Sequence, residues 1–214
     1  VAVEVNGSTT IENVQVSADI NASGYPLSGF VVYNKSQLSM KKCTFSGHIK
    51  STSNASVDIS GFISSMSGES SFKFDRCAFT GGIEILAGWR AGAFVSTNTS
   101  TMVADCEMNF CEMSGSISQE NGSERVGGFI GSPNTDKSSY IMRGCLMNGT
   151  CKRWKSNQEH VWITQENCII MGCGTWKTMG SNTSTTNCYL TPTTELTVNN
   201  MSGFNMASSE SLSS

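Results

Sequence analysis

Charged residues are scarce in this chain of 214 residues. They make up 14% of the sequence, with 14 Lys and Arg against 17 Asp and Glu, which gives a formal net charge of −3. Surfaces that bind nucleic acid phosphates are usually strongly basic. This charge balance therefore argues against nucleic acid as a partner. The chain also has only three prolines, too few for a proline-rich stalk.

Long apolar runs and catalytic motifs are also missing. No stretch approaches the roughly 20 apolar residues that span a bilayer, so we expect no transmembrane segment. Val1 opens directly into VAVEV, which is not typical of a signal peptide, so the sequence predicts a mature chain or an excised fragment. With no recognisable catalytic signature, we expect a protein that is not an enzyme and that uses no cofactor.

Small polar residues are abundant instead. Ser and Thr together number 54 and Asn adds 17, while 38% of the residues are hydrophobic and 21 are Gly. Enough apolar residues remain to bury a core, which argues against disorder along the whole chain. Function must therefore be inferred from architecture and surface chemistry.

An internal repeat organises most of the sequence. Four cysteines recur at exactly even spacing, within the segments MKKCTFSGHI, FDRCAFTGGI, NFCEMSGSI and MRGCLMNGTC: Cys43, Cys77, Cys111 and Cys145. Each is preceded by an apolar residue three positions earlier and followed by Phe or Met at +2 and Gly at +4. The segment IENVQVSADI matches this Cys element if Val14 takes the cysteine position, and QENCIIMGC matches it through Cys168.

A second element precedes each Cys element and contributes a phenylalanine. Its copies are SGFVV, SGFIS, GAFVS and GGFIG, with Phe30, Phe62, Phe94 and Phe129. Spacings of two within the Cys element place its apolar residues on one face of a strand. The runs STSNAS, SMSGESS, STNTST and QENGSE between the elements are typical of turns.

These patterns predict an all-β fold, a β-solenoid (β-helix) of about five or six stacked coils with a 34-residue repeat. We expect the solenoid to span residues 1–190, with each repeat forming one coil rather than two. Residues 191–214 are expected to be a polar C-terminal segment. Its SGFNM resembles the start of another repeat, an incomplete coil that would pair with a neighbouring molecule.

Both repeated elements resemble the repeats called GLUG motifs. These pair a Gly-Gly-aliphatic-Val/Ile-Gly element with a later apolar-x-Asn-Cys-x-x-x-Gly-x-Val/Ile element, as in GGFIGSPNTDKSSYIMRGCLMNG, and an Asn precedes the cysteine at Asn167. The resemblance implies a secreted or surface adhesin-like protein with a β-solenoid fold. It implies no catalytic residues.

Sequons for N-glycosylation are dense. Nine asparagines begin Asn-x-Ser/Thr without an intervening proline: Asn6, Asn21, Asn34, Asn54, Asn98, Asn121, Asn148, Asn182 and Asn200. Most fall in segments expected to be exposed turns, where an acceptor is accessible. The sequence therefore predicts a glycosylated extracellular or cell-surface protein, with Asn54, Asn98 and Asn121 as the foremost acceptors. The alternative is that Asn, Ser and Thr are only the turn residues of a polar solenoid.

The nine cysteines are expected to serve structure. Five lie on the repeat position that faces the core, where cysteine behaves as a small apolar residue: Cys43, Cys77, Cys111, Cys145 and Cys168. A disulfide between Cys151 and Cys173 is the first choice among the others. A zinc site is the competing interpretation, but the cysteine spacings of five or six are wider than in structural zinc sites, so no metal is expected.

The residue pattern is compatible with two further functions. Asp75 and Asp105 lie near the Cys elements of neighbouring repeats, and a close pair of carboxylates on one face would suggest a polysaccharide-degrading enzyme. Aromatic residues outside the repeat positions would form a sugar-stacking surface: Trp89, Trp154, Trp162, Trp176, Tyr25 and Tyr33.

The favoured function is structural. We expect an extracellular glycoprotein, the building block of a filament or surface coat, assembled head-to-tail into a homopolymer through the solenoid ends. An adhesin or carbohydrate-binding module is the alternative, and an enzyme comes third.

Overall fold

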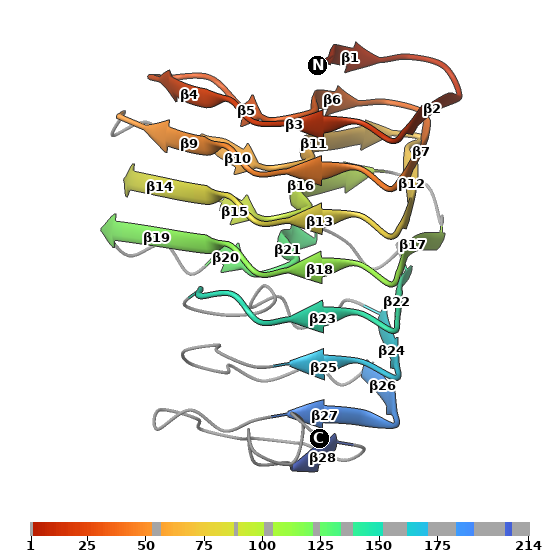
Figure 1. The fold of residues 1–214 in the computed structure, drawn as a ribbon. Helices are drawn as coiled ribbons and strands as arrows, with labels where there is room; N and C mark the ends of the chain where they lie inside the picture. Colours follow the sequence, from red (N-terminus) through yellow and green to blue (C-terminus); the bar gives the residue numbers. More distant parts are fainter. Residues whose placement is uncertain are drawn as a thin grey trace.

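The computed structural model describes residues 2–52, 57–87, 90–100, 105–121, 125–133, 139–151, 162–170, 183–190 and 204–206. Within these residues the strands form five parallel sheets, which we call A to E, stacked around one axis (Figure 1). The described residues contain no helix, and hence none that is long and apolar enough to cross a bilayer.

Between residues 2 and 127 the chain passes four times through the five sheets in the order A, B, C, D and E. Sheet A consists of β1 (Ala2–Val5), β6 (Val31–Asn34), β11 (Ile63–Gly68), β16 (Val95–Ser100) and β21 (Ile130–Pro133). Sheet B consists of β2 (Thr9–Glu12), β7 (Gln37–Lys41), β12 (Ser71–Asp75), β17 (Asp105–Asn109), β22 (Ser139–Arg143), β24 (Trp162–Glu166) and β26 (Thr183–Thr186).

The described strands of sheets C and E are only two or three residues long, whereas those of sheet D are longer. Sheet C consists of β3 (Gln15–Val16), β8 (Thr44–Phe45), β13 (Ala78–Phe79), β18 (Glu112–Met113), β23 (Leu146–Met147), β25 (Ile169–Ile170), β27 (Cys188–Leu190) and β28 (Phe204–Met206). Sheet D consists of β4 (Asp19–Ala22), β9 (His48–Ser51), β14 (Gly82–Ala87) and β19 (Ser116–Asn121). Sheet E consists of β5 (Leu27–Ser28), β10 (Asp58–Ser60), β15 (Arg90–Gly92) and β20 (Arg125–Gly127).

The strand register confirms that each repeat makes one wide coil. Phe79 pairs with Phe45 on one side and with Met113 on the other, and each partner is the equivalent residue of the neighbouring repeat. The predicted alignment of the first repeat is also confirmed, because Val16 pairs with Phe45 and so places Val14 at the cysteine position. A later coil is shorter than the 34-residue repeat, because Met142 of β22 pairs with Gln165 of β24, its equivalent in the next coil.

The predicted β-solenoid is therefore confirmed, although its coils are not uniform. Four coils have a described strand in all five sheets, formed by β1–β5, β6–β10, β11–β15 and β16–β20, and we number them coils 1 to 4. Coil 5 has described strands in sheets A, B and C, whereas coils 6 and 7 have them in B and C. The sequence predicted about five or six similar coils.

The C-terminal segment takes part in the solenoid. Within residues 191–214, β28 pairs in parallel with β27 of the same chain. SGFNM was expected to begin a coil that pairs with a neighbouring molecule. Its strand instead extends sheet C, the sheet of the Cys elements, so Phe204 aligns with Cys188 and not with the phenylalanines of the other element.

A column of phenylalanine rings fills one side of the interior. The rings of Phe30, Phe62, Phe94 and Phe129 stack along the axis, with centroids 4.9, 4.7 and 5.4 Å apart from one ring to the next. All four side chains are buried. The sequence prediction of this column is confirmed, and offset stacking of this kind adds to the gain from burial.

The interior is narrow, so a large side chain from one sheet faces a small residue from another. A Cβ added at Gly29 would collide with the ring of Phe45 of the same coil, and one added at Gly61 would collide with the ring of Phe79. In coil 5, a Cβ at Gly128 would lie 2.6 Å from the Met147 methyl group. The Gly or Ala before each phenylalanine therefore makes room for the Phe or Met that follows each cysteine.

The glycine of each Cys element allows neighbouring coils to approach closely. A Cβ at Gly47 would collide with the carbonyl of Ala18, one at Gly81 with that of Gly47, and one at Gly115 with that of Gly81. At this position a Cβ therefore points toward the preceding coil. Coil 1 has Ala18 here, the only described coil with a methyl group at this corner.

A left-handed residue turns the chain from sheet B into sheet C. The residue before each cysteine position has φ between 51° and 60° in seven successive coils: Asn13, Lys42, Arg76, Phe110, Gly144, Asn167 and Asn187. Glycine and asparagine adopt this conformation readily, whereas for other L-residues it costs roughly 1–2 kcal/mol. Lys42, Arg76 and Phe110 therefore strain the backbone at this corner.

Replacing a ring in the middle of the column tests its contribution. We expect Phe94→Ala to lower the free energy of unfolding by about 3–5 kcal/mol, because the rings above and below are held by their own coils and do not collapse into the cavity. Chemical denaturation measures this loss. The control is Tyr25→Ala, whose side chain is 75% exposed and whose removal should change stability little. Equal losses for both variants would contradict the importance of the column.

Candidate functional site

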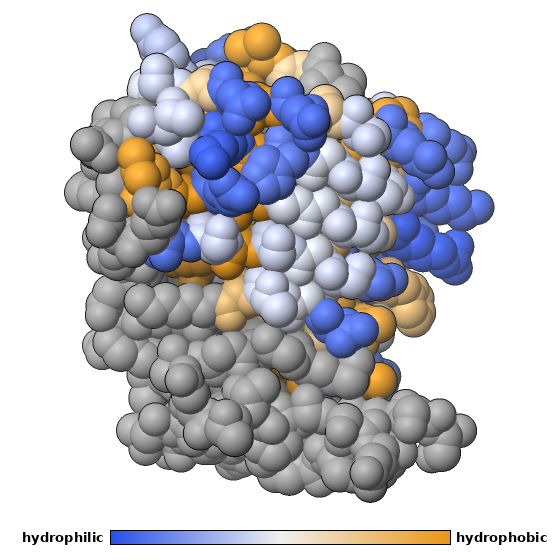
Figure 2. Space-filling model, turned by 60° about the vertical axis from the view of Figure 1, so that its left-hand side comes forward, coloured by the Kyte–Doolittle hydropathy of each residue, from blue (hydrophilic) through white to orange (hydrophobic). Residues whose placement is uncertain are grey.

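Three of the predicted glycan acceptors lie on the surface. Asn6 follows β1, Asn21 lies in β4, and Asn148 follows β23; all three are exposed. Asn148 lies in the outward row of sheet C that also contains the exposed Ser46 and Thr80. This row is small and polar, and Figure 2 shows a pale band of intermediate hydropathy along this side of the solenoid. These three amides are accessible to an oligosaccharide.

Two other predicted acceptors are buried, which corrects the sequence prediction. Asn34 and Asn98 are both 0% exposed and lie at the inner side of sheet A. Asn34 Nδ2 donates to the Ser71 carbonyl at 3.0 Å, and its Oδ1 accepts from the Ser36 amide at 3.3 Å. Asn98 Nδ2 donates to the Tyr140 hydroxyl at 2.6 Å. A glycan on either nitrogen is incompatible with this fold, because the nitrogen is engaged inside the coil.

The repeat itself contained the signal for this burial. Asn34 pairs with Val5 and Met66, and Met66 pairs in turn with Asn98, so the two asparagines belong to a row with apolar members. Aligning the sequons on the repeat would have shown that these two face inward. Of the remaining sequons, Asn54, Asn182 and Asn200 lie outside the described residues, and Asn121 ends β19 without a described side chain.

The cysteines of the repeat form a second interior column. Its members are buried at successive coils: Cys43, Cys77, Cys111, Cys145, Cys168 and Cys188. The thiols of Cys43, Cys77, Cys145 and Cys168 donate to backbone carbonyls of the preceding coil, as Cys77 does to Met40 at 3.5 Å and Cys145 to Met108 at 3.4 Å. Cysteine acts here as a small apolar side chain that also satisfies a carbonyl.

Cys188 was not recognised as a member of this column. It follows Asn187 and precedes Leu190 at +2, and β27 pairs with β25 so that Cys188 aligns with Cys168. The Asn-Cys pair, shared with Asn167–Cys168, was the available signal. The spacing between these two cysteines is much shorter than the repeat, and this hid it.

The described cysteines carry thiols and form no disulfide with one another. Cys151 occupies the predicted inward position of its repeat and is 7% exposed, but its sulfur is a thiol. Its predicted partner, Cys173, lies outside the described residues. Among the residues that are described, no three His, Cys, Asp or Glu side chains gather as metal ligands would.

The pKa values of the buried thiols differ along the column, and hydrogen bonds with the Cys111 thiol lower the pKa of Cys77 and of Cys145. Burial raises the pKa of the Cys111 thiol well above its ordinary value, and the hydrogen bond with the Cys145 thiol raises the pKa of Cys168 to about 12. Thiolate is the reactive form, so these two sulfurs remain protonated and inert at neutral pH. This favours a structural role for the column.

The two aspartates considered for catalysis do not form a pair. Asp75 ends β12 and Asp105 begins β17, and the register aligns Asp75 with Asn109. The two positions are thus four residues apart along neighbouring strands, about 13 Å at the usual rise per residue. The arrangement of two nearby carboxylates that glycoside hydrolysis needs is not formed by these residues.

A polar cluster lies on the outer face of sheet D. Glu84 accepts from Lys50 Nζ at 2.8 Å and lies 3.3 Å from His48 Nε2. The hydrogen bond from Lys50 lowers the pKa of the Glu84 carboxyl. The cluster borders a shallow open depression that Thr52 and Ser118 also line, and Figure 2 shows a hydrophilic patch over this face. These side chains satisfy one another across the coils and have no arrangement typical of a catalytic site.

Comparison with known proteins gives no family for the chain. It matches no protein-family model, no curated protein and no solved structure. The function of the chain is therefore inferred from its own sequence and structure.

Glycan mapping distinguishes the exposed from the buried sequons. In protein isolated from its native source, we expect glycans on Asn6, Asn21 and Asn148, and unmodified Asn34 and Asn98. Peptide mass spectrometry after enzymatic deglycosylation in heavy-oxygen water measures the occupancy of each asparagine. Glycans on both buried asparagines would show that the native chain does not have this register in sheet A.

Alkylation tests the thiol column. In the native protein we expect Cys77, Cys111 and Cys145 to resist iodoacetamide for hours, because the sulfurs are buried in the interior and the reagent cannot reach them. In denaturant the same cysteines should be modified within minutes, which provides the control. Rapid modification of Cys111 under native conditions, detected by mass spectrometry, would contradict a sealed interior column.

Proposed function

We propose that this chain is a structural building block of an extracellular filament or surface coat. The observation that carries the proposal is the continuous parallel stacking of its coils, in which the Phe and Cys columns run through the interior along the axis. Each coil is hydrogen-bonded to its neighbours in successive sheets, so a stack of coils forms a stiff rod. Such a rod suits mechanical support and spacing.

Ion pairs between neighbouring coils support this role. Five of the described pairs join side chains from successive coils: Lys35–Glu4, Lys50–Glu84, Lys73–Glu107, Arg90–Asp58 and Arg143–Glu166. Exposed pairs contribute little stability individually. Their arrangement along the axis instead opposes a slip of one coil against the next, because a slip would separate opposite charges.

An extracellular location is the proposal most consistent with the surface. The outward row of sheet C that contains Ser46, Thr80 and Asn148 is small and uncharged, and sequons open to solvent occur at Asn6, Asn21 and Asn148. Glycans on these asparagines would hydrate a surface that has few charges of its own. The resemblance to GLUG-motif repeats supports the same location.

Lengthwise association through the solenoid ends remains part of the proposal, with one constraint. Strands β1 to β5 are the edge strands of their sheets, and the apolar side chains of Ile11, Val16 and Ile20 are only partly buried at this face. The methyl group of Ala18 points out of the same face, where later coils have glycine. A coil that covers this face therefore cannot continue the repeat geometry at that corner.

The position of Val14 agrees with this constraint. In coils 2, 3 and 5 the thiol at this position donates to a carbonyl of the preceding coil, as Cys43 does to Ile11 at 3.5 Å. Valine has no such donor. Coil 1 thus lacks both the hydrogen-bond donor and the bare α-carbon with which these coils contact the coil before them.

Sedimentation velocity and electron microscopy test end-to-end assembly. We expect the purified chain to form linear oligomers whose length increases with concentration, and Ala18→Gly to lengthen them because it removes the methyl group from the contact face. The matched control is Ala22→Gly, which introduces the same backbone freedom within coil 1. Strictly monomeric behaviour of both the natural chain and Ala18→Gly at high concentration would show that head-to-tail assembly is wrong.

Carbohydrate binding is the second candidate function. Of the aromatic residues considered for it, Tyr25 is 75% exposed between β4 and β5, and Tyr33 is half-buried on sheet A. The four tryptophan side chains lie outside the described ones. A different row of exposed side chains favours this function, namely Lys42, Arg76 and Phe110 at the corner between sheets B and C.

A further inference from the structure

Backbone strain is concentrated in three successive coils at the corner between sheets B and C. Of the seven residues with positive φ before the cysteine positions, Asn13, Gly144, Asn167 and Asn187 are types that adopt this conformation readily. Lys42, Arg76 and Phe110 are the other three, with φ of 51°, 52° and 54°. We call these three residues the corner ridge.

Packing in the interior does not account for the corner ridge. The side chain of Arg76 is 57% exposed, Phe110 is 61% exposed, and Lys42 is also exposed. The same corner is formed elsewhere by Asn or Gly with the same backbone hydrogen bond to the following coil, as at Asn13 and Gly144. Strain that persists where a relaxed residue would serve points to selection for the exposed side chains.

The ridge is positively charged although the chain is negative overall. Coils 2 and 3 place four cations at this corner, Lys41, Lys42, Lys73 and Arg76. Three acids face them, namely Asp75 and the residues that the register aligns with Lys41 and Lys73 from the flanking coils, Glu12 and Glu107. Arg76 Nη1 lies 3.9 Å from Asp75 Oδ2, which is long for an ion pair, and Lys73 Nζ lies 3.6 Å from Glu107 Oε1. The four cations outnumber the three acids, so a net positive charge remains at this corner.

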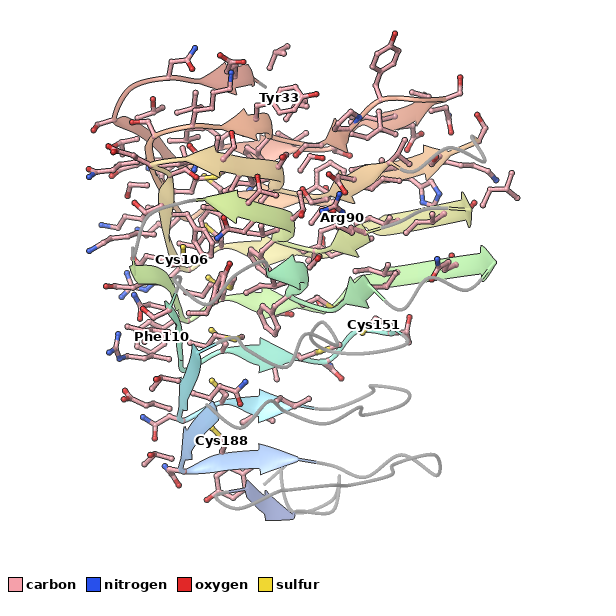
Figure 3. All side chains as sticks on the ribbon, turned by 180° about the vertical axis from the view of Figure 1, so that it is seen from behind. Tyr33, Arg90, Cys106, Phe110, Cys151 and Cys188 are labelled. Atoms are coloured by element: carbon pink, nitrogen blue, oxygen red, sulfur yellow. The ribbon has the colours of Figure 1, made fainter. Side chains whose placement is uncertain are left out.

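Phe110 extends this charged row with a fixed aromatic surface. Its ring lies against the α-carbon of Gly144 in the following coil, where an added Cβ would come within 2.7 Å of the ring Cδ1. Figure 3 shows Phe110 at the outer edge of the solenoid. Because Gly144 leaves room for the ring, the exposed aromatic face is held in place before any ligand arrives.

We propose that the corner ridge binds an acidic polysaccharide that lies along the solenoid axis. The three side chains are spaced by the strand separation, about 4.8 Å per coil, so they present two cations and then a ring in a straight line. Carboxylate or sulfate groups would pair with Lys42 and Arg76, and the apolar face of a sugar ring would pack on Phe110. This inference deepens the second candidate function, carbohydrate binding, and does not depend on filament assembly.

The shape of the corner ridge favours a polysaccharide over nucleic acid. The cationic surface is one row wide, which is too narrow to contact both phosphate strands of a duplex. A flexible acidic polysaccharide can follow the single row. Sulfated and carboxylated polysaccharides share this chemistry, so both are used as probes.

The experiment removes the charge and relieves the strain together. We compare binding of heparin and of polygalacturonate to the natural chain and to Lys42→Gly/Arg76→Asn, by calorimetry at several salt concentrations. Glycine is chosen at position 42 because Asn there would create an Asn-Cys-Thr sequon with Cys43 and Thr44. We expect about tenfold weaker binding of at least one probe and a salt dependence reduced by between about one and two units of slope.

Two further variants separate charge and stacking from misfolding. Lys35→Gln/Lys50→Gln removes the same net charge from the residue after β6 and from sheet D, and should leave binding unchanged. Phe110→Asn should weaken binding without changing its salt dependence, since no charge is lost. Arg76→Asn and Phe110→Asn should melt at the same temperature as the natural chain or higher, because Asn tolerates the positive φ, so their weaker binding cannot result from unfolding.

Four results would overturn the proposal: no binding of either acidic probe, equal loss in the Lys35→Gln/Lys50→Gln control, equal affinity for duplex DNA, or unchanged binding in the ridge variants. Binding of neutral dextran that the ridge variants leave intact would overturn the corner ridge as the site while upholding carbohydrate binding itself. Failure of all polysaccharides to bind would overturn both.

Discussion

The fixed separation of hydrogen-bonded parallel strands determines the rest of this structure. Neighbouring coils lie about 4.8 Å apart, so a residue in one coil lies directly over its equivalent in the next. An interior position must therefore be filled by a side chain that packs against copies of itself. Phenylalanine meets this condition by offset stacking, as the ring centroids 4.7 to 5.4 Å apart show. Cysteine meets it with a thiol that reaches the carbonyl of the coil before it.

The same constraint limits the width of the coil. Each coil crosses a similar cross-section, so a ring contributed from sheet C requires a residue without a side chain on the opposite wall. Gly29 and Gly61 meet this need opposite Phe45 and Phe79. This requirement is less strict in later coils. Met113 and Met147 there take the places of the Phe45 and Phe79 rings, and Ala93 takes the place of Gly29 and Gly61. The packing of the interior thus accounts for these glycines of the repeat.

Much of the fold could be predicted from the sequence because the repeat constrains residues in pairs. The even spacing of the cysteines, the two interior columns and the alignment of Val14 all depend on equivalent positions recurring, and sequence comparison within the chain detects recurrence. The prediction that Asn34 and Asn98 are exposed glycan acceptors was wrong because it did not use the repeat. A sequon is a local pattern of three residues, whereas burial depends on the coil above and below. The left-handed corner between sheets B and C was not predicted. Its seven positions are occupied by five residue types and share only a backbone conformation, which the sequence does not display.

The glycine corner gives the solenoid a direction of growth. Gly47, Gly81, Gly115 and Gly149 each leave room for a carbonyl from the coil before them, and Ala18 does not. An interior coil can therefore be copied and inserted beside its parent, since the copy fits both neighbours, but coil 1 transplanted to the interior would carry its methyl group into that carbonyl. A gene encoding such a chain can therefore lengthen by duplicating an interior coil, whereas a duplicated coil 1 would not fit between two other coils. The number of interior coils, and with it the length of the rod, is then free to change over evolutionary time.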